Sequence, residues 1–454
     1  MKNCAEYCLF YKVSVILYIS LVIYMISRTD LNFKADGRED MAKMKPFRAV
    51  RPKKEFAARV AALPYDVYSR QEAKKEVEEE PYSFLKIDRA ETQFPDEVDT
   101  YDDRVYEKAR DIYQEMKTDG IYIEDPDRCY YIYELTMDGR AQTGIVAVAS
   151  VDDYRNGVIK KHENTREEKE QDRIHHVDTM SAQTGPIFLA YRSNDALDQI
   201  VSKVKTETEA LYDFTAKDGI GHRVWKVSMA ADVEKIEKTF EQIGEIYIAD
   251  GHHRAASAVK VSLKRREEHP DYKGTEEFNF FLSVLFPDTE LLIMDYNRSV
   301  KDLNGLTKVE FIEKIQENFT VTELDGPKHP WAKGQVTMYL EKQWYLLEAK
   351  GELLKITDAV ASLDVSLLQD YLLKPVLGIE DPRTDERIAF IGGIRGLEEL
   401  ERRADEDMKV SFAMYPTSIH ELFDVADAGL LMPPKSTWFE PKLRSGIFIH
   451  EIEQ

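Results

Sequence analysis

The chain has 454 residues, and its 43% hydrophobic and 11% aromatic content suits a globular protein of two or three domains. The formal net charge of −22 argues against a nucleic-acid partner, because nonspecific DNA and RNA binding depends on Lys and Arg neutralising phosphates. Three cysteines occur (Cys4, Cys8 and Cys129), which excludes a disulfide framework and a cysteine-based zinc site and favours a cytoplasmic location.

Residues 1–43 form a hydrophobic leader that differs from the rest of the chain. Residues 13–26 are nearly all apolar, but the run is shorter than the roughly 20 residues that span a bilayer. No Ala-x-Ala cleavage site follows it. The leader fits an uncleaved anchor, a signal peptide or upstream sequence translated in error. We favour the last, because residues 37–40 before Met41 match a purine-rich ribosome-binding site read as codons, and we expect a membrane partner only if the leader is real.

After the leader, strand-like and helix-like segments alternate, which predicts a mixed α/β (α+β) protein. Three parts follow in order: an N-terminal α/β domain over residues 44–150, a central core over 151–267 and a C-terminal α/β domain over 268–454. No segment repeats at a fixed period, so a solenoid is not expected.

Periodicity, caps and turn residues place the main elements in chain order. Helices are expected at residues 69–80 (with a Ser69–Glu72 capping box), 102–119, 166–177, 232–243, 308–318 and 366–373. Strands are expected at residues 129–135, 143–151, 185–191, 221–227, 246–249, 278–286, 291–294, 335–340 and 344–349. The last stretch, residues 432–446, is basic for this protein and rich in turn residues, which is typical of a loop with a role in a site.

The most informative stretch is residues 247–254, Tyr-Ile-Ala-Asp-Gly-His-His-Arg. An apolar strand ends at the turn pair Asp250-Gly251, and an Ala-rich helix follows. The unpaired N–H groups and the dipole of that helix favour an anion. Three more donors crowd at the same point: His252, His253 and Arg254. We expect a phosphate site here, with Asp250 placed to bind a metal ion or a hydroxyl group; an ordinary structural turn is the competing interpretation.

A second constellation is a run of cations in this acidic chain. Its members are Lys160, Lys161, His162, Arg166, Lys169, Arg173 and His176. On a helix that begins at residue 166, the last four share one face, which can neutralise a polyphosphate; a solvated helix with i,i+4 ion pairs is the alternative. Glu163 lies among these cations, which would keep it ionised. A carboxylate in such a place can deprotonate a bound hydroxyl for attack on phosphorus.

Two further groups could line a pocket, although residues of this kind are more often structural. They are residues 295–298, which follow a predicted strand and include Asn297 and Arg298, and residues 435–438 in the late loop, which begin with Lys435. Arg173 is a further candidate for a pocket. The sequence has no Walker loop, no Gly-x-Gly-x-x-Gly with an acidic partner and no His-Glu-x-x-His motif.

Several segments together resemble an uncharacterised prokaryotic family, domain of unknown function 1015. They are residues 46–52 with 64–67, residues 159–166, residues 247–254 and, less closely, residues 434–442. The resemblance covers residues 44–454, and the family name implies no activity.

A more distant resemblance is to the ParB/sulfiredoxin superfamily, in particular its free serine kinases. The similar segments occur in the same order: Ile159-Lys-Lys-His-Glu163, a helix, Gly185-Pro-Ile187 and Asp250-Gly-His-His-Arg254. The resemblance implies a ParB/sulfiredoxin-like central core between flanking mixed α/β domains, with Glu163 as the catalytic base and Asp250 holding substrate or Mg²⁺. It also implies nucleotide phosphates bound among Lys160, His162, Arg166, Gly251, His252, His253 and Arg254.

The leading hypothesis is therefore a kinase that uses ATP or ADP with Mg²⁺ to phosphorylate a small hydroxyl compound, with free L-serine as the expected acceptor. The alternative is a regulatory switch that binds or hydrolyses a nucleotide and has no small-molecule acceptor. A DNA-partitioning role like that of ParB is disfavoured by the charge and by the lack of a helix-turn-helix pattern.

Overall fold

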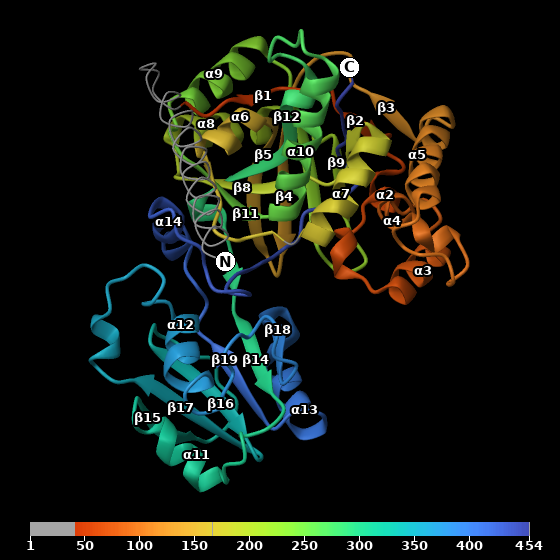
Figure 1. Cartoon of the computed structure of the whole chain (residues 1–454). Coiled ribbons are helices and arrows are strands. Elements are labelled where there is room, and N and C mark those ends of the chain that lie inside the picture. Colours follow the sequence, from red (N-terminus) through yellow and green to blue (C-terminus); the bar gives the residue numbers. More distant parts are fainter. Residues whose placement is uncertain (1–40, 166, 454) are drawn as a thin grey trace, which may run out of the picture. The chain divides into compact units, whose positions relative to one another are not determined.

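The structure, a computed structural model, describes residues 41–165 and 167–453 and confirms the mixed α/β class. In the described part of the chain, the largest element is a nine-stranded mixed sheet (Figure 1). Its strands run in the order β6 (Ile159–Lys160), β11 (Ile246–Asp250), β8 (Ile187–Tyr191), β12 (Phe280–Pro287), β5 (Arg140–Ser150), β4 (Tyr130–Met137), β10 (Gly221–Val227) and β9 (Tyr212–Thr215), with β1 (Met44–Lys45) beside β5. β6 is parallel to β11 and β8 is parallel to β12, whereas the other neighbours are antiparallel.

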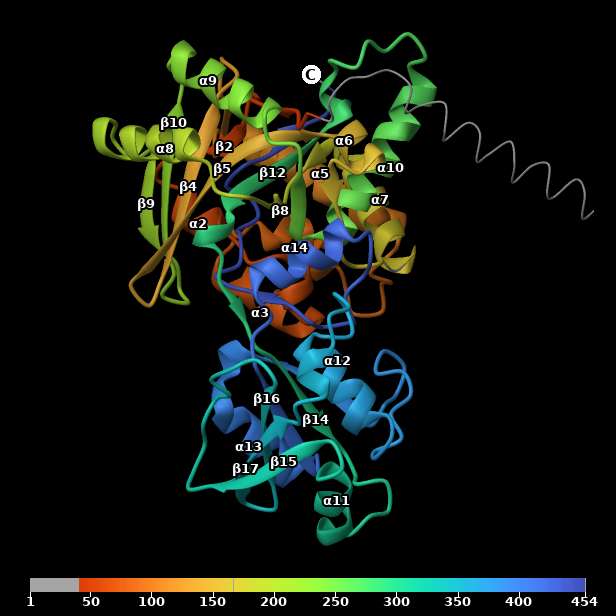
Figure 2. The ribbon, with the colours of Figure 1, turned by 90° about the vertical axis from the view of Figure 1, so that its left-hand side faces the viewer.

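Both faces of this sheet are buried, which explains why its central strands read as long apolar runs. Successive side chains of β4 enter different cores: Tyr131 and Tyr133 belong to one, Tyr130 and Ile132 to the other. The core of Tyr130 is closed by α6 (Val151–Asn156), α8 (Asp195–Glu207), α9 (Ala230–Glu241) and α10 (His252–Glu268). Helices α8 and α9 lie side by side (Figure 2).

The region before β4 is largely helical. The helices are α2 (Ala57–Val60), α3 (Arg70–Glu79), α4 (Leu85–Asp88) and α5 (Asp103–Thr118), and a strand pair, β2 (Val50–Pro52) with β3 (Tyr122–Glu124), lies beside them. The predicted capping box of α3 is confirmed, because Ser69 and Glu72 each accept a hydrogen bond from the backbone N–H of the other. Helix α5 packs on α7 (Glu167–Met180), so α7 lies between these helices and α10.

A second sheet, of six antiparallel strands within the described residues, follows later in the chain (Figure 1). Its order is β15 (Phe319–Leu324), β17 (Gln343–Ala349), β16 (Gln335–Leu340), β19 (Val410–Met414), β14 (Tyr296–Val300) and β18 (Ile388–Gly392). Helices α11 (Lys308–Ile315), α12 (Asp364–Leu368) and α13 (Gly396–Glu406) pack on this sheet. Helix α14 (Ile419–Asp427) instead lies beside β11 of the first sheet, where Phe423 stacks on Tyr247 (Figure 1).

The end of the chain returns toward the first sheet and forms two short strand pairs that are separate from it. β20 (Trp438–Phe439) pairs with β13 (Ile293–Met294), and β21 (His450–Glu451) pairs with β7 (Ala182–Gln183). Phe439, Leu443 and Phe448 join the core that contains Tyr131. The late loop therefore packs against the face of the nine-stranded sheet that carries Tyr131.

Two predicted elements differ from the structure. The strand expected at residues 291–294 is reduced to β13, because residues 288–290 form a helical turn before it. The helix expected at residues 366–373 is α12 followed by a π-helical turn, in which Gln369 Nε2 donates to Ile379 O at 2.7 Å. Of the helices that the structure describes, none is both long and apolar enough to cross a membrane. Residues 1–40 of the leader lie outside the described residues.

Candidate active site

Two carboxylates meet at one edge of the nine-stranded sheet. β6 and β11 are parallel neighbours, with Ile159 opposite Ile246, so both strands end at the same edge. Asp250 is the last residue of β11, and Glu163 follows β6 by three residues. Both residues line a cavity of about 670 Å³. This pairing brings together the two motifs that the sequence keeps nearly ninety residues apart.

The turn at Gly251 presents the N-terminus of α10 to this region. Gly251 has a φ of 94°, and its N–H donates to Asp250 Oδ1 at 2.9 Å. The first intrahelical bond runs from Ala255 N to Gly251 O at 2.9 Å, so the N–H groups of residues 252–254 come before it. A Cβ atom on Gly251 would lie 3.0 Å from Arg254 Nε. Glycine is therefore required both for the left-handed backbone and for the position of Arg254.

The change Gly251→Ala tests this turn. We expect a loss of about 1 kcal/mol in the free energy of unfolding from the positive φ, together with at least a tenfold loss in affinity for ADP or inorganic phosphate, because Arg254 must move. The matched control is Gly157→Ala, since Gly157 has a φ of 82° and nothing within 4 Å of an added Cβ. Urea unfolding and calorimetric titration measure the two effects. Equal anion affinity in both variants would contradict the assignment.

Asp250 is held as a carboxylate by two cations. Burial acts to raise its pKa, but Lys442 and Arg254 outweigh this effect and keep the pKa well below the usual range. Lys442 Nζ lies 3.4 Å and Arg254 Nη2 3.8 Å from Asp250 Oδ2. The other side of Arg254 is anchored, because Nη1 donates to Pro186 O at 2.6 Å. The site thus combines one permanent negative charge with two positive ones.

Two buried histidines lie behind Glu163. The rings of His162 and His252 meet edge to face with centroids 4.5 Å apart. The backbone N–H of His162 donates to His252 Nε2 at 3.5 Å. Burial lowers the pKa of His162 to about 4 and that of His252 well below its usual value, so both rings are neutral at pH 7. Since Nε2 accepts, the proton of His252 is on Nδ1, which lies 3.9 Å from Glu163 Oε2. The pair can orient Glu163 without adding charge.

The burial of His162 predicts an acid-sensitive stability. The unfolded chain takes up this proton below about pH 6.5, whereas the folded chain does so only near pH 4, so stability falls as pH drops through this window. In His162→Gln the fall should be smaller by up to about 3 kcal/mol. Urea unfolding at about pH 7 and about pH 4.5 gives the comparison. An identical fall in wild type and variant would show that His162 titrates normally.

The other described residues of the basic motifs do not line the 670 Å³ cavity. Lys160 Nζ pairs with Glu245 and Asp427 at 2.5 and 2.6 Å and is committed to those carboxylates. His253 lies near Glu170, whose pKa it helps to lower. Arg166 lies outside the described residues. Arg173 lines two other cavities, away from Glu163.

Of the late candidates, Tyr296 and residues 435–438, including Lys435, line the 670 Å³ cavity, whereas Asn297 and Arg298 do not. Asn297 is fully buried, donates to Asp295 Oδ2 at 2.5 Å and accepts from Met414 N at 2.8 Å. Arg298 donates to Tyr296 O and, at 3.1 Å, to Lys435 O. Asn297 and Arg298 thus support the wall from which Lys435 projects.

Sequence reasoning missed several residues that line the cavity. They are Asp66, Asp218, Arg395, Glu440 and Lys442. The basic, turn-rich composition of residues 432–446 was the available signal for Lys442. This loop is tied to the loop of Glu163, because Met432 N donates to His162 O at 2.8 Å.

The donor set fits Mg²⁺ only in part. No group of three or more His, Cys, Asp or Glu side chains able to hold a metal occurs among the residues described. Asp250 offers the hard carboxylate oxygen that Mg²⁺ prefers, and Mg²⁺ is often held by one or two carboxylates plus substrate phosphates and water. Asp250 can serve as such a ligand only when a phosphate is bound beside it.

Comparison with solved structures finds distant likenesses. A C-terminally truncated SbnI from Staphylococcus aureus is 12% identical with a TM-score of 0.35, over 66% of this chain and 85% of that one. A free serine kinase in complex with AMP is 14% identical with a TM-score of 0.31, over 66% of this chain and 91% of that one. A conserved hypothetical protein from Pyrococcus furiosus is 14% identical with a TM-score of 0.30, over 67% of this chain and 94% of that one. Scores of this size are too low for function to be inferred from them.

A search of curated proteins finds no match. The family comparison is decisive, because a single family matches residues 44–366, well over half of the chain. The predicted membership is thereby confirmed. The chain belongs to the family described as protein of unknown function, DUF1015.

Proposed function

We propose that this protein is a nucleotide-dependent kinase that phosphorylates a small hydroxyl compound. The observation that carries the proposal is the convergence of Glu163 and Asp250 in one cavity beside the N-terminus of α10. A carboxylate base, a second carboxylate and an anion cradle are the parts that phosphoryl transfer requires.

The cradle accounts for binding of phosphates. The N–H groups of residues 252–254 precede the first intrahelical bond of α10, and the helix dipole adds partial positive charge at the same point. Arg254 and Lys442 add two full positive charges. In an acidic protein this is a local basic site suited to the phosphates of ATP or ADP.

In this proposal Glu163 is the general base. The bound hydroxyl gives its proton to the Glu163 carboxylate while its oxygen forms a bond to the terminal phosphorus of the nucleotide. The bond from that phosphorus to the bridging oxygen breaks, and the leaving nucleotide keeps the electron pair. Neutral His252, whose Nδ1 lies 3.9 Å from Glu163 Oε2, can orient Glu163 without placing a positive charge beside it.

Asp250 completes the site. Its carboxylate would hold Mg²⁺ against the phosphates. Mg²⁺ there would neutralise the charge that develops on the transferred group. Lys442 and Arg254 keep the carboxylate ionised and in place when no metal is bound.

L-serine is the first acceptor to test, because residues 159–163 and 250–254 resemble the motifs of free serine kinases. The full chain would be incubated with Mg²⁺, ATP or ADP and each hydroxyl amino acid in turn, and followed by ³¹P NMR. A new phosphomonoester signal with one acceptor supports the kinase. Tight nucleotide binding without any such signal would replace it with the regulatory switch.

A further inference from the structure

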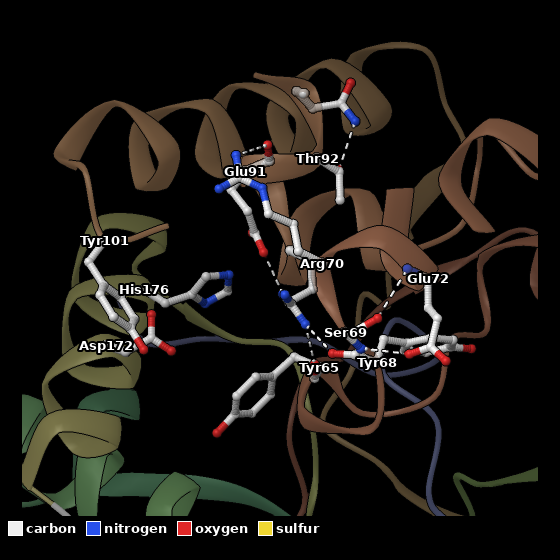
Figure 3. Close-up of polar contacts among 12 residues, drawn as sticks. Tyr65, Tyr68, Ser69, Arg70, Glu72, Glu91, Thr92, Tyr101, Asp172 and His176 are labelled. Carbon is white, nitrogen blue, oxygen red and sulfur yellow. Dashed lines mark hydrogen bonds and ion pairs between the residues drawn. The ribbon is translucent and has the colours of Figure 1, made fainter. Parts of the chain in front are cut away.

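The basic face of α7 lines a second cavity. Lys169, Arg173 and His176 border a space of about 230 Å³ between α7 and the N-terminal helices. Figure 3 shows Tyr101, Asp172 and His176 gathered on one side of this region, with Tyr65 facing them. The tyrosines of the lining are Tyr65, Tyr68, Tyr101 and Tyr106. We call this space the tyrosine cavity.

Two arginines hold the backbone that forms the wall of the tyrosine cavity. Arg89 donates from Nη1 to Tyr65 O at 3.0 Å and to Tyr68 O at 2.7 Å, and its Nε pairs with the buried Glu91 at 2.6 Å. From the same side, Arg70 donates to Val98 O at 2.8 Å, which holds the loop that leads to Tyr101. These bonds hold the backbone of the segments that carry Tyr65, Tyr68 and Tyr101.

Arg173 provides a buried positive charge at the inner end of the cavity. Its side chain is 9% exposed, and its guanidinium lies 3.9 Å from the centre of the Tyr65 ring. Burial acts to lower its pKa, but Asp172 and its other neighbours raise it, so the group stays charged. Asp172 occupies Nε and Nη2, each at 2.9 Å. Nη1 is the guanidinium nitrogen that Asp172 does not bind.

A narrow slot continues from the tyrosine cavity toward α10. The slot, about 30 Å³, shares Tyr65, Asp88, Arg173 and His176 with that cavity and is also lined by Gly185 and Arg254. Arg254 is the residue whose Nη2 faces Asp250. Residues 64–66 border all three spaces: Pro64 lines the slot and the 670 Å³ cavity, Tyr65 the slot and the tyrosine cavity, and Asp66 the tyrosine cavity and the 670 Å³ cavity.

We propose that the tyrosine cavity is the nucleoside subsite of the kinase and that the nucleotide phosphates pass Arg173 and Arg254 to reach Asp250 and Glu163. This inference rests on the proposed function. Aromatic rings suit a base, since every base has a face that can stack. Carboxylates such as Asp66 and Asp172 can accept hydrogen bonds from ribose hydroxyls or an exocyclic amine. The cavity is larger than serine needs, and Arg173 lines both it and the slot that also contains Arg254.

The subsite can be tested by placing a large side chain in the tyrosine cavity. Thr100 lines the cavity and is half-buried, so Thr100→Trp should occupy part of it and raise the Kd for ADP at least tenfold in calorimetric titrations. Tripolyphosphate, which lacks a nucleoside, should bind wild type and variant equally. Thr118→Trp, at an exposed position on α5 outside the cavity lining, is the matched control and should bind ADP normally. Tyr101→Ala, which removes a half-exposed ring, should weaken ADP binding about fivefold or more.

The outcomes separate this inference from the kinase assignment. If both Thr100→Trp and Tyr101→Ala bind ADP like wild type, the nucleoside lies elsewhere and the subsite is wrong, whether or not transfer occurs. An equal loss of ADP and tripolyphosphate affinity would also contradict it. If the variants lose affinity for ADP but not for tripolyphosphate, and no acceptor is ever phosphorylated, the nucleoside subsite is supported and the kinase assignment is wrong.

Discussion

Glu163→Gln is expected to reduce phosphoryl transfer by roughly 100- to 10,000-fold, the usual contribution of a general base, while nucleotide affinity stays within a few fold of wild type. The substitution keeps the size of the side chain but removes the group that accepts the proton. Single-turnover transfer followed by ³¹P NMR measures the rate, and titration with ADP measures binding.

The matched control is Glu167→Gln, because Glu167 is a neighbouring, exposed glutamate of α7 with a side chain 72% exposed. Its rate should equal that of wild type. If Glu163→Gln transfers phosphate as fast as Glu167→Gln does, Glu163 is not the base. If instead Glu163→Gln loses ADP binding and rate together, its role is in binding.

Asp250→Asn is expected to separate the metal-dependent from the metal-independent part of nucleotide binding. Asparagine retains an oxygen that can accept from Gly251 N, so the turn survives. Without Mg²⁺, affinity for ADP should rise or stay level, because a negative charge beside the phosphates is removed while Lys442 and Arg254 remain. With Mg²⁺, the gain in affinity seen for wild type should disappear and transfer should fall at least 100-fold.

Titrations of ADP with and without Mg²⁺ give the comparison for Asp250→Asn. The neighbouring change Lys442→Met serves as the opposite control, since it removes a positive charge and should weaken ADP binding in both conditions. An Asp250→Asn protein whose Mg²⁺ response matches wild type would remove Asp250 from the metal site.

Local sequence patterns were sufficient for the turn and helix at residues 250–268. The apolar run, the Asp-Gly pair and the Ala-rich start predict β11, the turn and α10 because each depends on neighbours within a few residues. The resemblance of residues 159–163 to a kinase motif predicted that Glu163 and Asp250 belong to the same site. The parallel pairing of β6 and β11, which brings them together, had to come from the fold.

Long-range contacts could not be predicted in this way. Lys442 lies 192 residues from Asp250 in the chain, and only the return of the late loop across the sheet makes it a partner. The shared face of Lys169, Arg173 and His176 was predicted by helical spacing, but spacing alone cannot say what the face meets. Because α5 packs on α7, that face lines the tyrosine cavity and not the cavity of Glu163.

The most direct measurement runs the reaction in ¹⁸O-labelled water with Mg²⁺, nucleotide and the accepted hydroxyl compound, and reads the isotope in each product by ³¹P NMR. A kinase transfers the phosphoryl group to the acceptor oxygen, so we predict a phosphomonoester free of ¹⁸O that is lost in Glu163→Gln. Formation of ¹⁸O-labelled inorganic phosphate alone, at equal rates in wild type and Glu163→Gln, would contradict the assignment.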